Sequence, residues 1–331
     1  MQEKIDLARL LLAWYARNGR SFPWRFKENE KPDPYAIWVS EIMLQQTTIA
    51  TGLPYFERWM KAFPTLQALA AASLDEVLRL WQGLGYYTRA KKMYACAQEL
   101  VRMGGFPTDR EALLKLPGIG PYTASAIAAF AFHQPTTVVD GNVVRVLSRL
   151  YGLTGAVTPE KIYPLAEQLT DRQHPSDYAS AIMDLGAVIC RKHNPLCEQC
   201  PWKKHCIAHK QGLTDKIPYL PKTAKQGIHG AVFVIFNKQH HIFICQAESK
   251  RLLGGLWELP WSQQADWRPI KARWKKQPKT VRHIFTHIDL ILDVYTTCAD
   301  KVDLKGRFID KSEIANYAFS TLMKKVLALI D

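Results

Sequence analysis

Four of the seven cysteines lie within seventeen residues, so their thiols can converge on one metal site. Their spacing is Cys190-x6-Cys197-x2-Cys200-x5-Cys206. Thiolates bind iron–sulfur clusters, and four of them can also hold a structural zinc ion in a tetrahedral site. The cysteine spacing by itself therefore predicts a bound metal or cluster and leaves iron–sulfur and zinc as alternatives.

The remaining cysteines and the N-terminus favour metal binding over disulfide bonds. Cys96, Cys245 and Cys298 lie far apart in the chain. Residues 1–6 begin an acidic, amphipathic stretch without the apolar core and small-residue cleavage site of a signal peptide. We therefore expect a reducing cytosol, in which closely spaced thiols bind metals rather than form disulfides.

A single acid lies within an otherwise apolar segment that has helical spacing. Ile37 and Trp38 precede Glu41 by one helical turn, and Leu44 follows it by one turn. Burial among such groups disfavours the charged carboxylate and raises its pKa. Glu41 is therefore a candidate general acid at neutral pH, with a solvated surface glutamate as the alternative.

A second acid lies directly before a helical run. Asp140 begins Asp140-Gly-Asn-Val-Val-Arg, where an N-cap carboxylate accepts backbone N–H groups and stays ionised. A purely structural cap is the alternative. One neutral carboxylic acid and one carboxylate are also the pair that cleaves a glycosidic bond through a cationic transition state.

A Gly/Pro loop joins two predicted helices, a short one over residues 110–115 and an alanine-rich one up to Phe132. The loop reads Leu116-Pro-Gly-Ile-Gly-Pro-Tyr122. Its glycines permit a sharp turn that points N–H groups outward beside a helix N-terminus, where a phosphate can bind. A plain turn between helices is the alternative.

Length and charge predict more than one domain and a polyanionic partner. The chain has 331 residues and a net charge of +14, and none of its apolar runs reaches the roughly 20 residues of a membrane span. Helical spacing continues to about residue 210, and β-branched and aromatic runs begin near residue 226. The Pro- and Lys-rich stretch between them reads as a linker, and the C-terminus as a helix over residues 311–330.

Together these motifs resemble the helix-hairpin-helix DNA glycosylase superfamily, and within it the adenine DNA glycosylase (MutY) family. Besides the loop, Asp140 and the cysteines, the resemblance rests on Trp38-Val-Ser-Glu-Ile-Met-Leu-Gln-Gln-Thr47 and Trp81-Gln-Gly-Leu-Gly-Tyr-Tyr-Thr-Arg-Ala90. It implies an all-α glycosylase with an iron–sulfur subdomain, followed by a MutT-like (Nudix-type) α+β domain. The expected boundaries are a helical region 1–210 (a six-helix subdomain 22–133, and a cluster subdomain of 1–21 with 134–210), a linker 211–225 and a MutT-like domain 226–331.

The resemblance also assigns roles at the reacting centre. Glu41 is expected to protonate adenine, Asp140 to stabilise the sugar cation, and Tyr122 to support the intermediate. In the related endonuclease III a lysine stands at the position of Tyr122 and forms a Schiff base, which a tyrosine cannot do. The resemblance therefore implies a monofunctional enzyme that leaves an abasic site.

Further residues are expected to hold the DNA and the cofactor. The MutT-like domain lacks the Glu-rich, metal-binding helix of an active pyrophosphohydrolase, so it is expected to be a recognition module. Threonine at position 286 stands where the family usually has serine. By resemblance, Trp24, Arg25, Leu44 and Asp184 line the adenine pocket; Gln46, Thr47, Leu84 and Tyr86 wedge the duplex; Pro117, Gly118 and Gly120 bind a phosphate; Phe285, Thr286 and His287 contact 8-oxoguanine; and Cys190, Cys197, Cys200 and Cys206 hold a [4Fe–4S] cluster.

The expected function is removal of adenine mispaired with 8-oxoguanine or guanine in double-stranded DNA during base-excision repair. We expect a monomer in the bacterial cytosol or nucleoid, with no membrane partner. Two other functions are weighed against it. One is a glycosylase with lyase activity like endonuclease III, and the other is a non-catalytic iron–sulfur DNA-binding protein.

Overall fold

The structure is a computed structural model that separates into two compact units. The first unit contains residues 1–70 and 95–221, and the second contains residues 71–94 and 222–331. No helix in the described part of the chain is both long and apolar enough to span a bilayer. The described residues are 2–26, 30–218, 224–248, 253–264 and 266–330.

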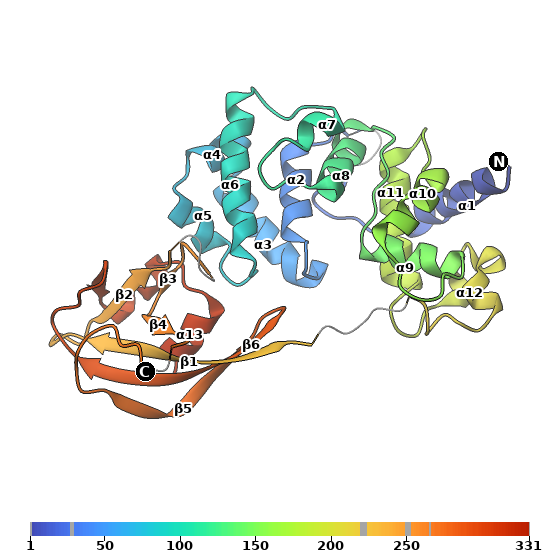
Figure 1. Cartoon of the computed structure of the whole chain (residues 1–331). Coiled ribbons are helices and arrows are strands. Elements are labelled where there is room, and N and C mark those ends of the chain that lie inside the picture. Colours follow the sequence, from blue (N-terminus) through green and yellow to red (C-terminus); the bar gives the residue numbers. More distant parts are fainter. Residues whose placement is uncertain (1, 27–29, 219–223, 249–252, 265, 331) are drawn as a thin grey trace. The chain divides into compact units, whose positions relative to one another are not determined.

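The chain up to residue 210 is helical (Figure 1), as the apolar spacing predicts. Short π- and 3-10-helical turns, η1 to η3, accompany the cysteine region. The helices and turns are α1 (Gln2–Asn18), α2 (Pro34–Met43), α3 (Ile49–Ala62), α4 (Leu66–Ala71), α5 (Leu74–Leu80), α6 (Tyr87–Arg102), α7 (Arg110–Leu113), α8 (Pro121–Phe132), α9 (Gly141–Leu150), α10 (Pro159–Leu169), α11 (Pro175–Asp184), η1 (Leu185–Ile189), η2 (Cys197–Gln199), η3 (Lys203–His205) and α12 (Ile207–Lys210).

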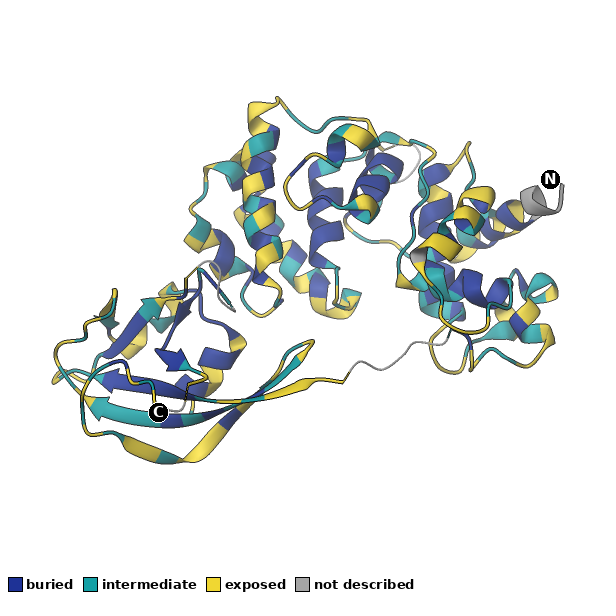
Figure 2. Ribbon diagram, in the orientation of Figure 1, coloured by how far each residue is buried: buried dark blue, intermediate teal, exposed yellow. Residues whose placement is uncertain are grey.

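Two helices buried along most of their length, α2 and α8, pack against each other in the first unit. The side chain of Asp33 caps α2 by accepting the N–H of Tyr35, and Pro34 occupies the first helical turn. Helix α8 begins after Gly120 and is rich in alanine, whose small side chain permits close helix packing. A helix that is apolar on every side is stable only when neighbours cover it, which explains the central place of both helices (Figure 2).

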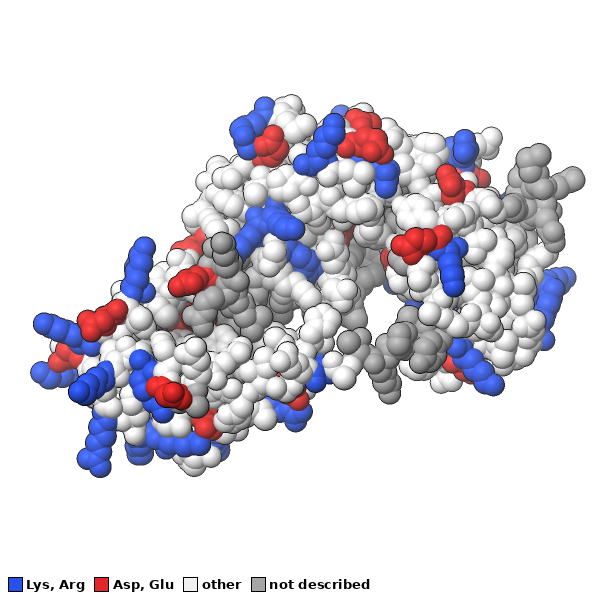
Figure 3. Space-filling view, viewed as in Figure 1, with Lys and Arg blue, Asp and Glu red and all other residues white. Residues whose placement is uncertain are grey.

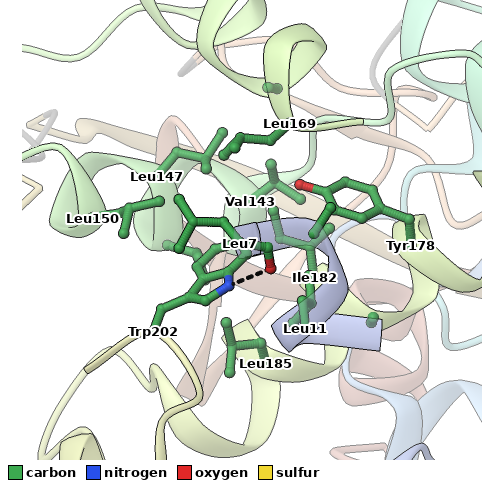
Figure 4. Close-up of a cluster of buried hydrophobic side chains, with 14 of the residues drawn as sticks. Leu7, Leu11, Val143, Leu147, Leu150, Leu169, Tyr178, Ile182, Leu185 and Trp202 are labelled. Carbon is green, nitrogen blue, oxygen red and sulfur yellow. Dashed lines mark hydrogen bonds between the residues drawn. The ribbon is translucent and has the colours of Figure 1, made fainter. Parts of the chain in front are cut away.

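A second core in this unit joins α1 to the helices that follow residue 140. Figure 4 shows Leu7 and Leu11 of α1 among Leu147 and Ile182. The indole Nε1 of Trp202 donates to the carbonyl oxygen of Leu7 at 2.8 Å, and Trp202 is almost fully buried. Because Trp202 lies between the third and fourth cysteines, this core anchors the cysteine region to α1.

The described residues of the second unit form a seven-stranded sheet. The long strands β1 (Gln226–Phe236) and β6 (Ile288–Cys298) run parallel, and the main path through the sheet is β3-β2-β1-β6-β5. Helix α13 (Thr321–Leu327) buries Leu322 and Val326 in the core that covers one face. The other strands are β2 (Ile242–Gln246), β3 (Trp257–Glu258), β4 (Trp261–Ser262), β5 (Lys275–Ile284) and β7 (Gly306–Ile309).

A helical region followed by an α+β domain agrees with the expected fold class, with two local differences. The single helix expected over residues 311–330 is wrong, because the 3-10 helix η4 (Lys311–Asn316) and α13 are separate. Tyr317 is extended, and Ser320 starts a new helix by accepting the N–H of Met323. Strand β5 was not expected, because its lysines and proline hide the alternation of a strand.

Candidate active site

A cavity of about 1090 Å³ opens in the first unit, beside α2 and the N-termini of α8 and α9. Glu41, Tyr122 and Asp140 all line it. These three residues come from segments far apart in the sequence, and the packing of α2 against α8 brings the first two together. The expected catalytic residues therefore share one cavity large enough for a nucleobase.

Glu41 has the raised pKa that its apolar helix predicts. Its side chain is 8% exposed, and burial raises the pKa of its carboxyl to about 7. The hydrogen bond from Tyr122 lowers this pKa, and the nearby charge of Asp140 raises it again. The hydroxyl of Tyr122 donates to Oε2 of Glu41 at 2.7 Å. Burial raises the pKa of Tyr122 as well, so this tyrosine stays a neutral donor.

Asp140 is the N-cap of α9, as its place in the sequence predicts. Its Oδ1 accepts the N–H of Val143 at 2.8 Å, and its Oδ2 accepts from the amide of Asn142 at 2.8 Å. Burial nevertheless raises the pKa of Asp140, and these hydrogen bonds oppose that rise. The sequence predicts a capping carboxylate that stays ionised; the cap is present, but desolvation is the larger effect on the pKa of Asp140 and raises it.

A second hydrogen-bond chain connects Asp140 to the cysteine region. Asn142 accepts from the guanidinium of Arg145 at 2.8 Å, and Nε of Arg145 donates to the carbonyl oxygen of Cys190 at 2.8 Å. Arg145 also donates to the carbonyl oxygen of Gly186. The orientation of the active-site carboxylate is therefore tied to the backbone that carries the first cysteine.

Asp184 lies behind the cavity wall and contacts the pocket through two arginines. Its carboxylate is fully buried and is not among the groups that line the cavity. Arg20 donates to it from Nε at 2.9 Å and from its backbone N–H at 3.0 Å, and Arg25 donates from both terminal nitrogens at 2.7 and 2.8 Å. Burial alone raises the pKa of Asp184, but these hydrogen bonds outweigh burial and lower it. Asp184 was expected to line the adenine pocket. It instead positions Arg20 and Arg25, which do line the cavity.

The other expected pocket residues line the cavity. Trp24 is buried and stacks its ring on Phe22, with centroids 5.2 Å apart, and Leu44 lies at the end of α2. Several other residues line the cavity that no motif in the sequence indicates. Those with polar side chains include Tyr15, Arg20, Thr48, Tyr163, Ser176, Asp177 and Ser180.

The hairpin loop has the backbone that its glycines predict. Gly118 has φ +78°, a conformation that favours glycine, and Pro117 is exposed. Gly120 caps α8 without a side chain, and a Cβ added there would meet no atom within 4 Å. Gly118 and Gly120 also line the cavity, so the loop offers open backbone beside the catalytic residues.

The residues expected to wedge the duplex differ in exposure. Gln46 is exposed with φ +61°, and Thr47 is partly buried at the cavity. In the second unit, Tyr86 is 46% exposed with φ +48°, whereas Leu84 is only 8% exposed. Leu84 is therefore part of the interior of its loop, and Tyr86 is the side chain that this loop presents to solvent.

Tyr86 meets the loop between β5 and β6 within the second unit. Its hydroxyl lies 2.6 Å from Oγ1 of Thr286. The carbonyl oxygen of Phe285 accepts from Lys225 at 3.1 Å, and His287 is exposed. Gln82 donates to the carbonyl oxygen of Phe319 at 2.6 Å, which adds a second link between residues 71–94 and the sheet. The expected wedge residue and the expected 8-oxoguanine loop thus form one polar surface.

The four cysteines suit a soft metal or cluster by donor type and by surroundings. Cys190, Cys200 and Cys206 pack partly buried against the core around Trp202. A guanidinium nitrogen of Arg149 donates to Sγ of Cys190 at 3.4 Å, as N–H groups do to thiolate ligands. Within the described ranges, however, no three His, Cys, Asp or Glu side chains converge as metal ligands. Cys206 points its thiol instead to the carbonyl oxygen of Arg149 at 3.3 Å.

Comparison with known proteins defines the class to which this fold and site belong. A family described as HhH-GPD superfamily base excision DNA repair protein matches residues 39–172, and the NUDIX domain matches residues 231–329. The solved structure of a thermostable thymine-DNA glycosylase superposes with a TM-score of 0.57 and 28% identity, over 63% of this chain and 98% of that one. An endonuclease III–DNA complex shares the fold with a TM-score of 0.53 and 23% identity, over the same shares of the two chains. The chain is thus a helix-hairpin-helix base-excision repair protein with a Nudix-type domain.

Relatives that match most of the chain narrow the class to one family. The adenine DNA glycosylase of Rattus norvegicus is 34% identical, over 98% of this chain and 77% of that protein. The enzyme of the same name from Buchnera aphidicola subsp. Schizaphis graminum is 37% identical, over 76% of this chain and 74% of that protein. The chain belongs to the adenine DNA glycosylase family.

Proposed function

We propose that this protein removes adenine from mispaired DNA by hydrolysing the N-glycosidic bond. The observation that carries the proposal is the pair of Glu41 and Tyr122, hydrogen-bonded at 2.7 Å in a cavity that Asp140 also lines. A carboxyl with a pKa of about 7 can deliver a proton to a ring nitrogen of adenine, which makes the base a better leaving group. Asp140, on the same cavity, stabilises the cationic sugar that forms as the bond breaks.

The same cavity favours hydrolysis without strand cleavage. A glycosylase with lyase activity needs an amine nucleophile to form a Schiff base. Tyr122 offers a phenol that is neutral and engaged with Glu41, and lysine is not among the described residues that line the cavity. We infer a monofunctional enzyme, whose product is an abasic site.

Recognition of 8-oxoguanine opposite the adenine belongs to the second unit in this proposal. The exposed ring of Tyr86 and the Thr286 hydroxyl are joined by a hydrogen bond of 2.6 Å, and His287 is exposed beside them. A hydroxyl and an imidazole can bond to the edge of an 8-oxoguanine, while the tyrosine ring stacks on a neighbouring base. The Nudix-type domain is accordingly a recognition module, with adenine opposite 8-oxoguanine or guanine as the substrate.

The four cysteines are proposed to hold a [4Fe–4S] cluster that orders the loop around them. Their donor type, the N–H donor from Arg149 and the Trp202 core support this proposal. The purified protein should be brown, with about four iron atoms per chain, and Cys200→Ser should reduce the iron content and the visible absorbance together. A colourless protein that contains zinc would assign the site to a structural zinc ion instead.

Monomeric action in the cytosol completes the proposal. All the residues assigned to the chemistry lie in one chain and one cavity, so the site needs no second copy. Gel filtration coupled to light scattering, at the concentration used in activity assays, should therefore give the mass of one chain.

Single-turnover release of adenine is the experiment that tests the function. The substrate is a duplex with adenine opposite 8-oxoguanine, and half of each sample is treated with alkali. Adenine release with strand breaks only after alkali supports the proposal. Breaks without alkali would identify a lyase, and tight binding without release would identify a DNA-binding protein that does no chemistry.

A further inference from the structure

The edge of the sheet formed by β5 carries a concentration of positive charge that the active site does not use. Residues 266–284 contain seven of the sixteen Lys and Arg residues of the C-terminal domain and one acid, Asp266. Strand β5 is the last strand on the main path of the sheet, so one of its edges faces outward. Figure 3 shows Lys and Arg side chains gathered over the part of the sheet domain in which β5 lies in Figure 1.

Two of these cations are already paired within the sheet. Arg282 contacts Asp289 at 2.5 Å, and Lys276 contacts Asp293 at 2.7 Å. Arg268 lies over the rings of Phe233 and Tyr295 on the face of the sheet. The remaining four are exposed and form no ion pair within the described ranges, and we call them the basic rim: Lys271, Arg273, Lys275 and Lys279.

Protection of an exposed sheet edge explains only part of this charge. Lysine and proline on an edge strand prevent pairing with another chain, and Lys279 and Pro278 fit that purpose in an irregular part of β5. Lys271 and Arg273, however, precede the strand, where there is no edge to protect. Four cations over nine residues, none paired with an acid in the described part of the chain, are instead suited to a polyanion.

The place of the basic rim in the chain, close to the loop that carries Thr286, indicates that the polyanion is duplex DNA. Strand β5 leads directly into the loop that carries Thr286, and at roughly 3.4 Å per residue Lys279 lies up to about 24 Å from it along the chain. A DNA strand presents one phosphate about every 3.4 Å along the helix axis. A duplex with its mispair at Thr286 therefore has phosphates at the distance at which the rim lies. We propose that the basic rim binds the phosphate backbone of the duplex several base pairs from the mispair. The distance of the bound phosphates from the mispair rests on the proposed contact of Thr286 with the opposite base. The binding of phosphates by the rim does not depend on that contact.

The test measures how salt weakens binding of the full-length protein to undamaged duplex DNA. The variant K271Q/R273Q/K275Q/K279Q is compared with wild type by fluorescence anisotropy on a duplex of about 30 base pairs. Each phosphate contact contributes about 0.9 to the slope of log K against log salt concentration, so the slope should fall by up to about 3.6. The control K238Q/K301Q/K305Q/K324Q removes the same charge from other exposed positions in the domain and should change the slope by less than one contact.

Two more measurements keep the result decisive. Circular dichroism should give the same thermal midpoint for both variants, and K271R/K275R/K279R, which keeps the cations, should retain the wild-type slope. Equal losses in the rim variant and the control would overturn the proposal in favour of net charge. An unchanged slope with increased self-association would overturn it in favour of edge protection. Because undamaged DNA is used, the result is independent of whether 8-oxoguanine is the preferred opposite base.

Discussion

The hydroxyl of Tyr122 donates a hydrogen bond to Oε2 of Glu41 across the contact between α8 and α2, at 2.7 Å. The bond lowers the pKa of Glu41, but burial is the larger effect and leaves that pKa raised to about 7. The phenol therefore orients the acid without removing its ability to hold a proton at neutral pH. This balance between orientation and protonation leads directly to two predictions about pH.

The single-turnover rate of adenine release should fall on the alkaline side of pH 7. Glu41 must carry a proton to protonate the base, so above its pKa of about 7 the rate should drop roughly tenfold per pH unit. The measurement is adenine release at saturating enzyme between about pH 5 and 9. Tyr122→Phe removes a bond that lowers this pKa, so its profile should shift toward higher pH. A profile that is flat across this range would contradict the role of Glu41 as the acid.

Glu41 should reduce stability at alkaline pH. Its folded-state pKa is raised above the unfolded value of 4.5, so the folded state binds the proton more tightly. The contribution of Glu41 to stability is then fully present below about pH 4.5 and is lost as pH rises through about 7. At pH 8 the free energy of unfolding of Glu41→Gln should therefore exceed that of wild type by up to about 3 kcal/mol. At pH 5 the two free energies should be similar. Denaturant unfolding at both pH values checks this, with Glu111→Gln on the surface as the control.

Asp184→Asn should weaken the fold and the pocket together. The buried carboxylate is the shared acceptor of Arg20 and Arg25, and an amide leaves both guanidinium groups incompletely paired. Removing one partner of a buried ion pair costs about 3 kcal/mol or more. We expect a lower thermal midpoint and a weaker affinity for DNA that contains the mispair. The exposed control Asp215→Asn should change neither, and an unperturbed Asp184→Asn protein would show that the arginines hold their positions without the acid.

The Tyr86–Thr286 hydrogen bond should contribute to the preference for 8-oxoguanine over guanine. Thr286→Val keeps the shape of the side chain but removes the hydroxyl, whereas Thr286→Ser keeps the hydroxyl and removes the methyl. Only the valine variant should lose preference, by a factor of about 5 to 10, since one hydrogen bond is worth about 1 kcal/mol. The ratio of adenine release rates opposite the two bases measures this preference.

A double-mutant cycle distinguishes the effect of the Tyr86–Thr286 hydrogen bond from independent effects of the two side chains. If the two hydroxyls act through each other, Tyr86→Phe with Thr286→Val should lose no more preference than either change alone. Additive losses would instead mean that each residue contacts the DNA independently.

Local chemistry in the sequence was sufficient to identify several elements of the site. The apolar neighbours of Glu41 predicted its burial, and the position of Asp140 before a helical run predicted its capping role. The glycines of the hairpin loop predicted a sharp turn, and Gly118 has the positive φ that such a turn uses. These predictions hold because the nearest few residues along the helix or turn determine them.

Predictions that depended on distant partners were less complete. Nothing near Asp184 in the sequence shows that Arg20 and Arg25, more than 150 residues away, occupy its carboxylate. Leu84 shares an exposed-looking glycine loop with Tyr86, and only packing shows that the leucine is buried and the tyrosine is not. The pKa of Asp140 likewise depends on desolvation by the whole cavity, which its own capping bonds do not reveal.

The sequence by itself determined the order of helical and α+β regions, the family, and the types of residue available for acid catalysis and metal binding. The tertiary structure decided which of those residues meet. It places Tyr122 on Glu41 and joins Tyr86 to Thr286. It also leaves the four cations of the basic rim, beside and along β5, without an ion pair to any described residue. The physical reason is that periodicity and capping act over a few residues, whereas burial and hydrogen bonding between distant segments exist only once the chain has folded.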